Sequence, residues 1–133
     1  MWSSLSKYQN FALLVMRLGL GGMFIMHGFP KIIGGMEKWQ KLGSAMDYLG
    51  LHSFHTAFGF AAAFSEFFGG IALVLGLFFR PAALLMTFTM IVAAMMHLGK
   101  GDGIIGAAHA IEAGVVFFAL IFIGPGAHSI DKR

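Results

Sequence analysis

Three ionisable residues interrupt apolar segments that are each long enough to cross a lipid bilayer. Arg17, Glu66 and Glu112 lie in three different segments of this kind. An ionisable side chain costs several kcal/mol in hydrocarbon, so such residues are rare, face the inside of a bundle and find partners. The chain is 58% hydrophobic and 11% charged, whereas a soluble domain carries about 25% charged residues. The sequence therefore predicts an all-α membrane bundle built around a charged core.

Four apolar runs predict four membrane-spanning helices, over about 10–29, 56–79, 81–98 and 104–123. A transmembrane helix needs about 20 residues, so four spans use most of the 133 residues. This leaves a single membrane domain over 1–133. Gly and Pro clusters separate the runs, and the short connections favour an up-down-up-down four-helix bundle.

Residues 36–49 differ from these runs because apolar side chains recur at helical spacing among polar ones. The apolar positions are Met36, Trp39, Leu42, Met46 and Leu49. The segment is too polar to span a membrane. We therefore expect a short amphipathic helix in the membrane interface, with a solvated loop as the alternative. The side of the membrane that holds this segment is called side two below.

Charge and cysteine content exclude several classes of function. The formal charge is +3, but the basic residues are scattered and flank the apolar runs. This placement is typical of interfacial anchors and not of a nucleic-acid interface. The basic residues divide equally between the two sides, so charge does not orient the chain. The chain has no cysteine, which excludes thiol chemistry and Cys-ligated metal within it.

Depth along each predicted helix, at roughly 1.5 Å per residue, places the three charged residues in one layer. Arg17, Glu66 and Glu112 lie roughly 18, 15 and 12 Å from side two. All three depths are near the middle of a hydrocarbon core about 30 Å thick. We expect this central layer to face the inside of the bundle.

Three histidines from three helices are expected closer to side two. His27, His97 and His109 lie roughly 3, 2 and 8 Å from it, with Lys31 four residues after His27. His109 and Glu112 are three residues apart and share a helical face. That face would connect a histidine-lined mouth to the charged layer.

This arrangement favours proton handling. Two carboxylates and one arginine leave a surplus acid, which we expect to be protonated or paired with a protonated histidine. Such a group can carry a proton. Quinone reduction takes up protons as well as electrons, so histidine and glutamate in series suit a quinone head group that enters from lipid.

Other functions remain open. The charged layer alone could be an ion-pair knot that fixes helix register in a scaffold or assembly factor without chemistry. His109-x-x-Glu112 resembles half of a di-metal helical site, although a complete set needs more carboxylates. Two facing histidines could hold haem. A small-molecule or ion transporter would require several copies of so small a bundle.

The residues also resemble the DoxX family in their order along the chain. The motifs that carry the likeness run from about residue 11 to 131: Arg17-Leu18, His27-Gly28 with Lys31, Glu66 with Gly69-Gly70, Leu75-Gly76-Leu77, Arg80, Glu112 and Gly124-Pro125-Gly126-Ala127-His128-Ser129-Ile130-Asp131. The resemblance implies a four-helix bacterial or archaeal inner-membrane protein with both termini in the cytoplasm. It also implies an association with thiosulfate:quinone oxidoreductase or with thiol and oxidative stress. Because this chain lacks cysteine, any sulfur chemistry would belong to a partner.

We therefore expect an inner-membrane redox subunit that binds a quinone-like molecule and works with a partner oxidoreductase. Homo-oligomers are a further possibility. The expected proton-handling residues are Glu66 and Glu112, tuned by Arg17. The expected ligand-binding residues are His27, His97, His109 and Lys31, and no residue is assigned as a metal ligand.

Overall fold

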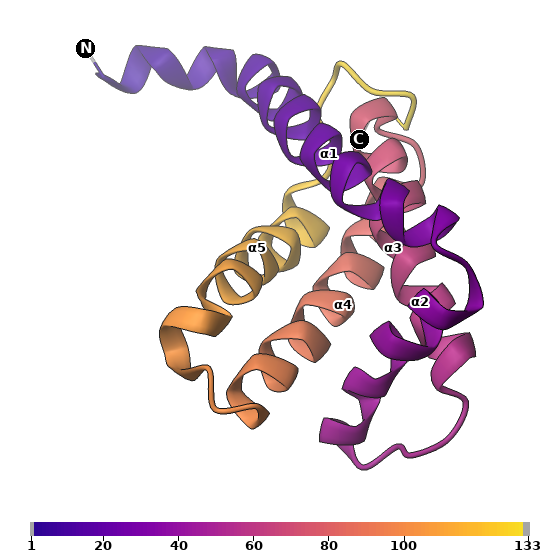
Figure 1. Ribbon diagram of the computed structural model, residues 1–133. Coiled ribbons are helices and arrows are strands. Elements are labelled where there is room, and N and C mark those ends of the chain that lie inside the picture. Colours follow the sequence, from indigo (N-terminus) through magenta and orange to yellow (C-terminus); the bar gives the residue numbers. More distant parts are fainter. Residues whose placement is uncertain (1, 132–133) are drawn as a thin grey trace.

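The computed structural model describes residues 2–131, and this part of the chain is helical with short connections (Figure 1). The elements are the 3₁₀ helix η1 (Trp2–Tyr8), α1 (Gln9–Ile33), α2 (Gly35–Gly43), the 3₁₀ helix η2 (Ser44–Leu49), α3 (His55–Leu75), α4 (Phe79–Gly99) and α5 (Gly103–Ile123). Four helical stretches are long and apolar enough to cross a membrane: η1 with α1, α3, α4 and α5. The predicted all-α class with four spans is confirmed.

Two helix boundaries differ from the sequence prediction. α1 continues through Pro30 to Ile33, one turn beyond the predicted end at Phe29. Proline removes one backbone donor but the helix persists, and the chain turns only at Gly35, where φ is +81°. α3 ends at Leu75, earlier than the predicted Phe79, because Gly76 adopts the left-handed conformation that often terminates helices.

The amphipathic segment forms α2 and η2, so the helix expected over 36–49 is present. It runs alongside the first half of α3 (Figure 1). A Cβ atom on Gly59 would collide with the carbonyl of Trp39, and one on Gly43 with the carbonyl of His55. α1 and α2 together therefore follow the length of α3.

Glycines set the register between α1 and α3. A Cβ atom on Gly28 would lie 2.5 Å from the amide nitrogen of Phe67, and one on Gly70 would lie 2.7 Å from the carbonyl oxygen of Gly21. The two helices are antiparallel, and the last turns of α1 lie beside the middle of α3. α1 consequently ends beside the middle of α3, and α2 covers the remaining part of α3.

The order of the helices in space is α1, α3, α4, α5. The core contains side chains from all four helices: Phe24, Leu73, Phe79, Ala83, Met86, Met90, Ala110, Ala113, Phe117 and Leu120. In the described part of the chain, no Cα atom of α5 lies within 8 Å of a Cα atom of α1. These two helices meet only through side chains, along a line that we call the α1–α5 seam.

Candidate functional site

Arg17 holds the end of the bundle opposite side two. Its guanidinium donates to the carbonyl oxygens of Leu73 at 2.9 Å and Val74 at 2.8 Å. It also donates to the carbonyl oxygens of His128 at 2.8 Å and Pro125 at 3.3 Å. The residue is 2% exposed, and its charge offsets the negative end of the α3 dipole.

The C-terminal segment is fixed at this same end, which we call side one. The carboxylate of Asp131 accepts hydrogen bonds from the backbone amides of Phe78 at 3.1 Å and Phe79 at 2.8 Å, at the start of α4. The side-chain oxygen of Asn10 accepts one from the amide of Ala127 at 2.9 Å. The terminal motif therefore joins the α3–α4 turn to α1, and Arg17 belongs to this structural junction.

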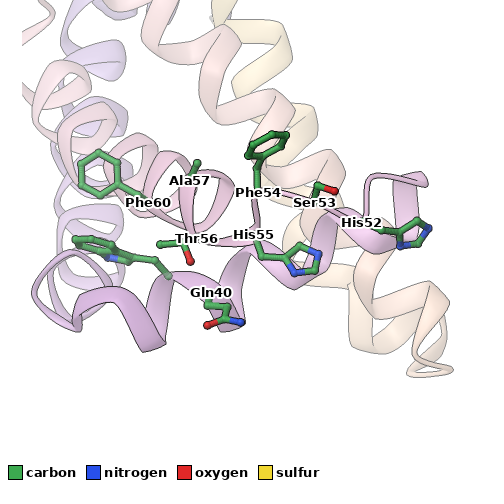
Figure 2. Close-up of a pocket in the computed structure, with 9 residues that line it drawn as sticks. Gln40, His52, Ser53, Phe54, His55, Thr56, Ala57 and Phe60 are labelled. Atoms are coloured by element: carbon green, nitrogen blue, oxygen red, sulfur yellow. The ribbon is translucent and has the colours of Figure 1, made fainter.

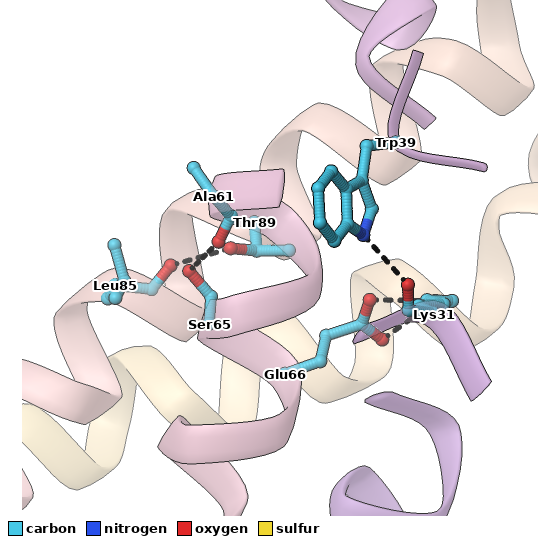
Figure 3. A network of polar contacts seen from close by, with 7 residues as sticks. All are labelled: Lys31, Trp39, Ala61, Ser65, Glu66, Leu85 and Thr89. Carbon is cyan, nitrogen blue, oxygen red and sulfur yellow. Dashed lines mark hydrogen bonds and ion pairs between the residues drawn. The ribbon is translucent and has the colours of Figure 1, made fainter. Parts of the chain in front are cut away.

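Lys31 and Glu66 form an ion pair near the middle of α3. The ammonium of Lys31 lies 2.7 and 3.0 Å from the two carboxylate oxygens of Glu66, whose side chain is 8% exposed. The indole of Trp39 donates to the carbonyl oxygen of Lys31 at 3.0 Å. Figure 3 shows these three side chains pointing toward one another.

The depths of Arg17 and Lys31 therefore differ from the sequence expectation. Arg17 contacts carbonyls at the side-one end of α3, while Lys31 reaches Glu66 at its centre. The expectation treated Phe29 as the side-two end of the first span. The glycine contacts instead place the end of α1 beside the middle of α3, and Glu112 is exposed on α5. The expected inward-facing layer of Arg17, Glu66 and Glu112 is therefore not formed.

The α1–α5 seam brings two of the three predicted histidines together. The ring centroids of His27 and His109 are 5.9 Å apart. Phe24 stacks on His109 at 6.2 Å and meets His27 edge-on at 5.7 Å. Phe24 also contacts Phe117 at 5.0 Å and is 3% exposed, so it forms an apolar floor below two exposed imidazoles.

Glu112 lies three residues from His109 on the exposed surface of α5. Within α1, α3, α4 and α5 as described, His27, His109 and Glu112 are the ionisable side chains that have neither a hydrogen bond nor an ion pair. Hydrocarbon offers such groups no compensation. The seam is therefore the place where a ligand or a partner would supply the missing contacts.

His97 does not join this cluster. Its Nδ1 lies 2.8 Å from a carboxylate oxygen of Asp102, in the α4–α5 turn. Residues 2–131 contain no group of three or more His, Cys, Asp or Glu side chains placed to hold a metal ion. The three histidines expected at one mouth therefore lie in two places: His27 and His109 at the α1–α5 seam, and His97 beside the α4–α5 turn.

A second polar cluster, on side two, was not predicted from the sequence. One carboxylate oxygen of Asp47 lies 2.8 Å from Nε2 of His55 and 3.0 Å from Nδ1 of His52. Hydrogen bonds from two histidines lower the pKa of Asp47, and the bond from His55 has a larger effect than the bond from His52. In the same way His97 lowers the pKa of Asp102. His52 and His55 also line an open pocket of about 670 Å³ with Trp39 and Phe60 (Figure 2).

The missed contacts had weak signals in the sequence. Asp47, His52 and His55 are polar residues around a turn, a common pattern without a fixed meaning. Trp39 indicated an amphipathic helix, and nothing in its spacing pointed to the carbonyl of Lys31. These contacts depend on how α2 lies against α3, which periodicity does not give.

Comparisons with known proteins agree on one family. The DoxX family model matches residues 12–98. The inner membrane protein YphA of Escherichia coli is 30% identical, over 91% of this chain and 89% of YphA. An uncharacterised protein of Haemophilus influenzae is 29% identical, over 98% and 96% of the two chains. The inner membrane protein YqjF of Escherichia coli is 29% identical, over 96% and 95%. No solved structure matches at a significant level.

Proposed function

The chain belongs to the DoxX family, and from that premise we propose that it binds a quinone-like molecule at the α1–α5 seam. It would act in the inner membrane, where two of its relatives are named as residing, as a subunit linked to a partner oxidoreductase. The observation that carries the proposal is the pair of exposed imidazoles of His27 and His109, without hydrogen bonds, beside the buried ring of Phe24. Glu112 follows His109 by three residues on α5.

The chemistry of the seam suits a quinone head group. The carbonyl oxygens of a quinone accept hydrogen bonds, and an imidazole can donate one from a ring nitrogen. The imidazoles of His27 and His109 are exposed above the buried ring of Phe24, and a flat ring can stack on such an aromatic surface. The groups face the lipid side of the helices, so a lipid-soluble ligand can arrive laterally.

Proton handling is assigned to Glu112 and His109, which share a helical face. Reduction of the ligand takes up protons, and a positioned carboxylic acid and imidazole can deliver them. Glu66, with its carboxylate held by Lys31, is the second proton-handling candidate, and Lys31 follows His27 by one helical turn on α1. The proposal assigns the electron supply to the partner oxidoreductase, and this chain has no cysteine with which to supply electrons by thiol chemistry.

Two of the expected site residues have other roles in this proposal. Arg17 directs four hydrogen bonds to backbone carbonyls at side one. His97 pairs with Asp102 in the α4–α5 turn. We assign both to structure.

Binding measurements test the proposal. Protein purified in native lipid nanodiscs is analysed for extractable quinone, haem and metal, and the affinity for a short-chain quinone is then measured after delipidation. Replacing His109 with Leu removes one hydrogen-bond donor and should weaken binding about tenfold. His128→Leu is the matched control because His128 accepts a hydrogen bond through its backbone carbonyl, which the substitution retains.

Two outcomes would reject the quinone site. Equal quinone affinity in His109→Leu and His128→Leu would show that quinone does not bind at the seam. Native protein that carries no quinone and binds none after delipidation would favour the scaffold function, in which the partly buried Lys31–Glu66 pair serves helix packing alone.

A further inference from the structure

Glu112 lies on a face of α5 that no other part of the described chain covers. Residues at intervals of three and four define this outward face of α5: Ile105, Ala108, Glu112, Val115, Ala119 and Phe122. Ile105, Val115 and Phe122 are 84%, 64% and 68% exposed. Apolar residues there are ordinary for a helix in lipid. The carboxylate of Glu112 is unusual on such a face, because an ionised group in hydrocarbon requires a partner.

We infer that a second copy of this chain covers the outward face of α5, with His109 of each copy hydrogen-bonded to Glu112 of the other. Within one chain no described Lys or Arg pairs with Glu112: Arg17 binds carbonyls and Lys31 binds Glu66. His109 is the closest group along α5 that can supply a proton or a positive charge, and it has no hydrogen bond of its own.

Membrane geometry favours this exchange of contacts. When two copies insert with the same orientation, a two-fold axis perpendicular to the bilayer places α5 beside the parallel α5 of the partner. In such an interface, residue i meets residue j of the partner and j meets i. His109 and Glu112 differ by three residues, roughly 4.5 Å along the axis, which their side chains can span. The symmetry therefore forms two equal pairs.

The surface between the pairs allows close approach. Ala108 and Ala119 stand on either side of Glu112 on the same face. Small residues let transmembrane helices approach, and polar side chains add hydrogen bonds between them. An imidazole has two ring nitrogens, so His109 can hold Glu112 of the partner on one and face the seam with the other. Each α1–α5 seam would then be completed by a carboxylate of the second copy.

Cysteine cross-linking tests this interface directly, because the chain has no cysteine of its own. Val115→Cys is compared with Leu84→Cys, which is 60% exposed on α4. Both variants are placed in synthetic bilayers without quinone and oxidised. Val115→Cys should form disulfide-linked dimers and Leu84→Cys should not. Equal cross-linking of the two, or none at Val115 or any other outward-face position, would overturn the inference.

Exchange of the paired residues supplies a second test. His109→Glu and Glu112→His should each weaken dimerisation about tenfold, measured by single-molecule photobleaching in dilute vesicles. The double variant restores both pairs and should return to within about twofold of the original affinity. A double variant no better than the single variants would overturn the pairing. Because no quinone is present in these assays, a failure of the quinone site leaves their result unchanged, and a failure here leaves the quinone measurement intact.

Discussion

The junction at side one and the α1–α5 seam both carry ionisable residues, yet their surroundings are opposite. Arg17 and Asp131 at side one make six hydrogen bonds to backbone groups, at 2.8–3.3 Å. His27 and His109 at the seam, and Glu112 on the exposed surface of α5 beside it, make none. A charge that its own chain satisfies fixes a fold, whereas one left open to lipid marks a place for a partner. Ionisable residues in a membrane bundle should therefore be separated by their contacts before any of them is assigned to chemistry.

The largest effect is expected at Arg17. Arg17→Leu removes four hydrogen bonds at once and leaves buried carbonyls at the end of α3 without a donor, which should lower the free energy of unfolding by about 5 kcal/mol. Reversible denaturation in mixed micelles measures this loss. Arg80→Leu is the control, because Arg80 is exposed and binds only carbonyls at the end of α5. A stable Arg17→Leu variant that fails to bind quinone would contradict this account, because Arg17 would then serve ligand binding and not the fold.

The second-largest effect is expected at the Lys31–Glu66 ion pair. Glu66→Leu leaves an unpaired ammonium in the membrane interior and should cost about 3–4 kcal/mol of unfolding free energy. The double replacement Lys31→Met with Glu66→Leu should recover most of it, because no charge then remains without a partner. The same denaturation assay checks both variants. If the double variant were as unstable as Glu66→Leu, the pair would have a role beyond mutual neutralisation.

The smallest effect concerns Asp47 on side two. Hydrogen bonds from His55 and His52 lower its pKa, so the ionised form is favoured in the folded protein. The stabilisation is present above the ordinary carboxyl pKa of 3.8 and is lost as pH falls through the lower folded value. The difference in Tm between the protein and Asp47→Asn should therefore shrink on acidification below about pH 4. A difference that grows on acidification would contradict the assignment.

Sequence patterns predicted the helices better than the relations between them. Hydropathy gave four spans and the amphipathic helix because both depend on residues close in the chain. The expected position of Lys31 near the side-two histidines was wrong because the register of α1 on α3 depends on contacts such as that of Gly28 with Phe67. Residue counts along one helix cannot give this register. For the same reason the sequence did not show that His97 lies apart from His27 and His109. His97 pairs with Asp102 in the α4–α5 turn.

Photoaffinity labelling tests the quinone site most directly. An azido-quinone is added to native membranes that contain the protein, activated by light, and the modified residues are identified by mass spectrometry. The account predicts labels on both sides of the α1–α5 seam, near Phe24 and His27 on α1 and near His109 and Glu112 on α5, which excess unmodified quinone removes. Labels confined to the side-two pocket around Trp39 and His55, or no label that quinone displaces, would contradict it.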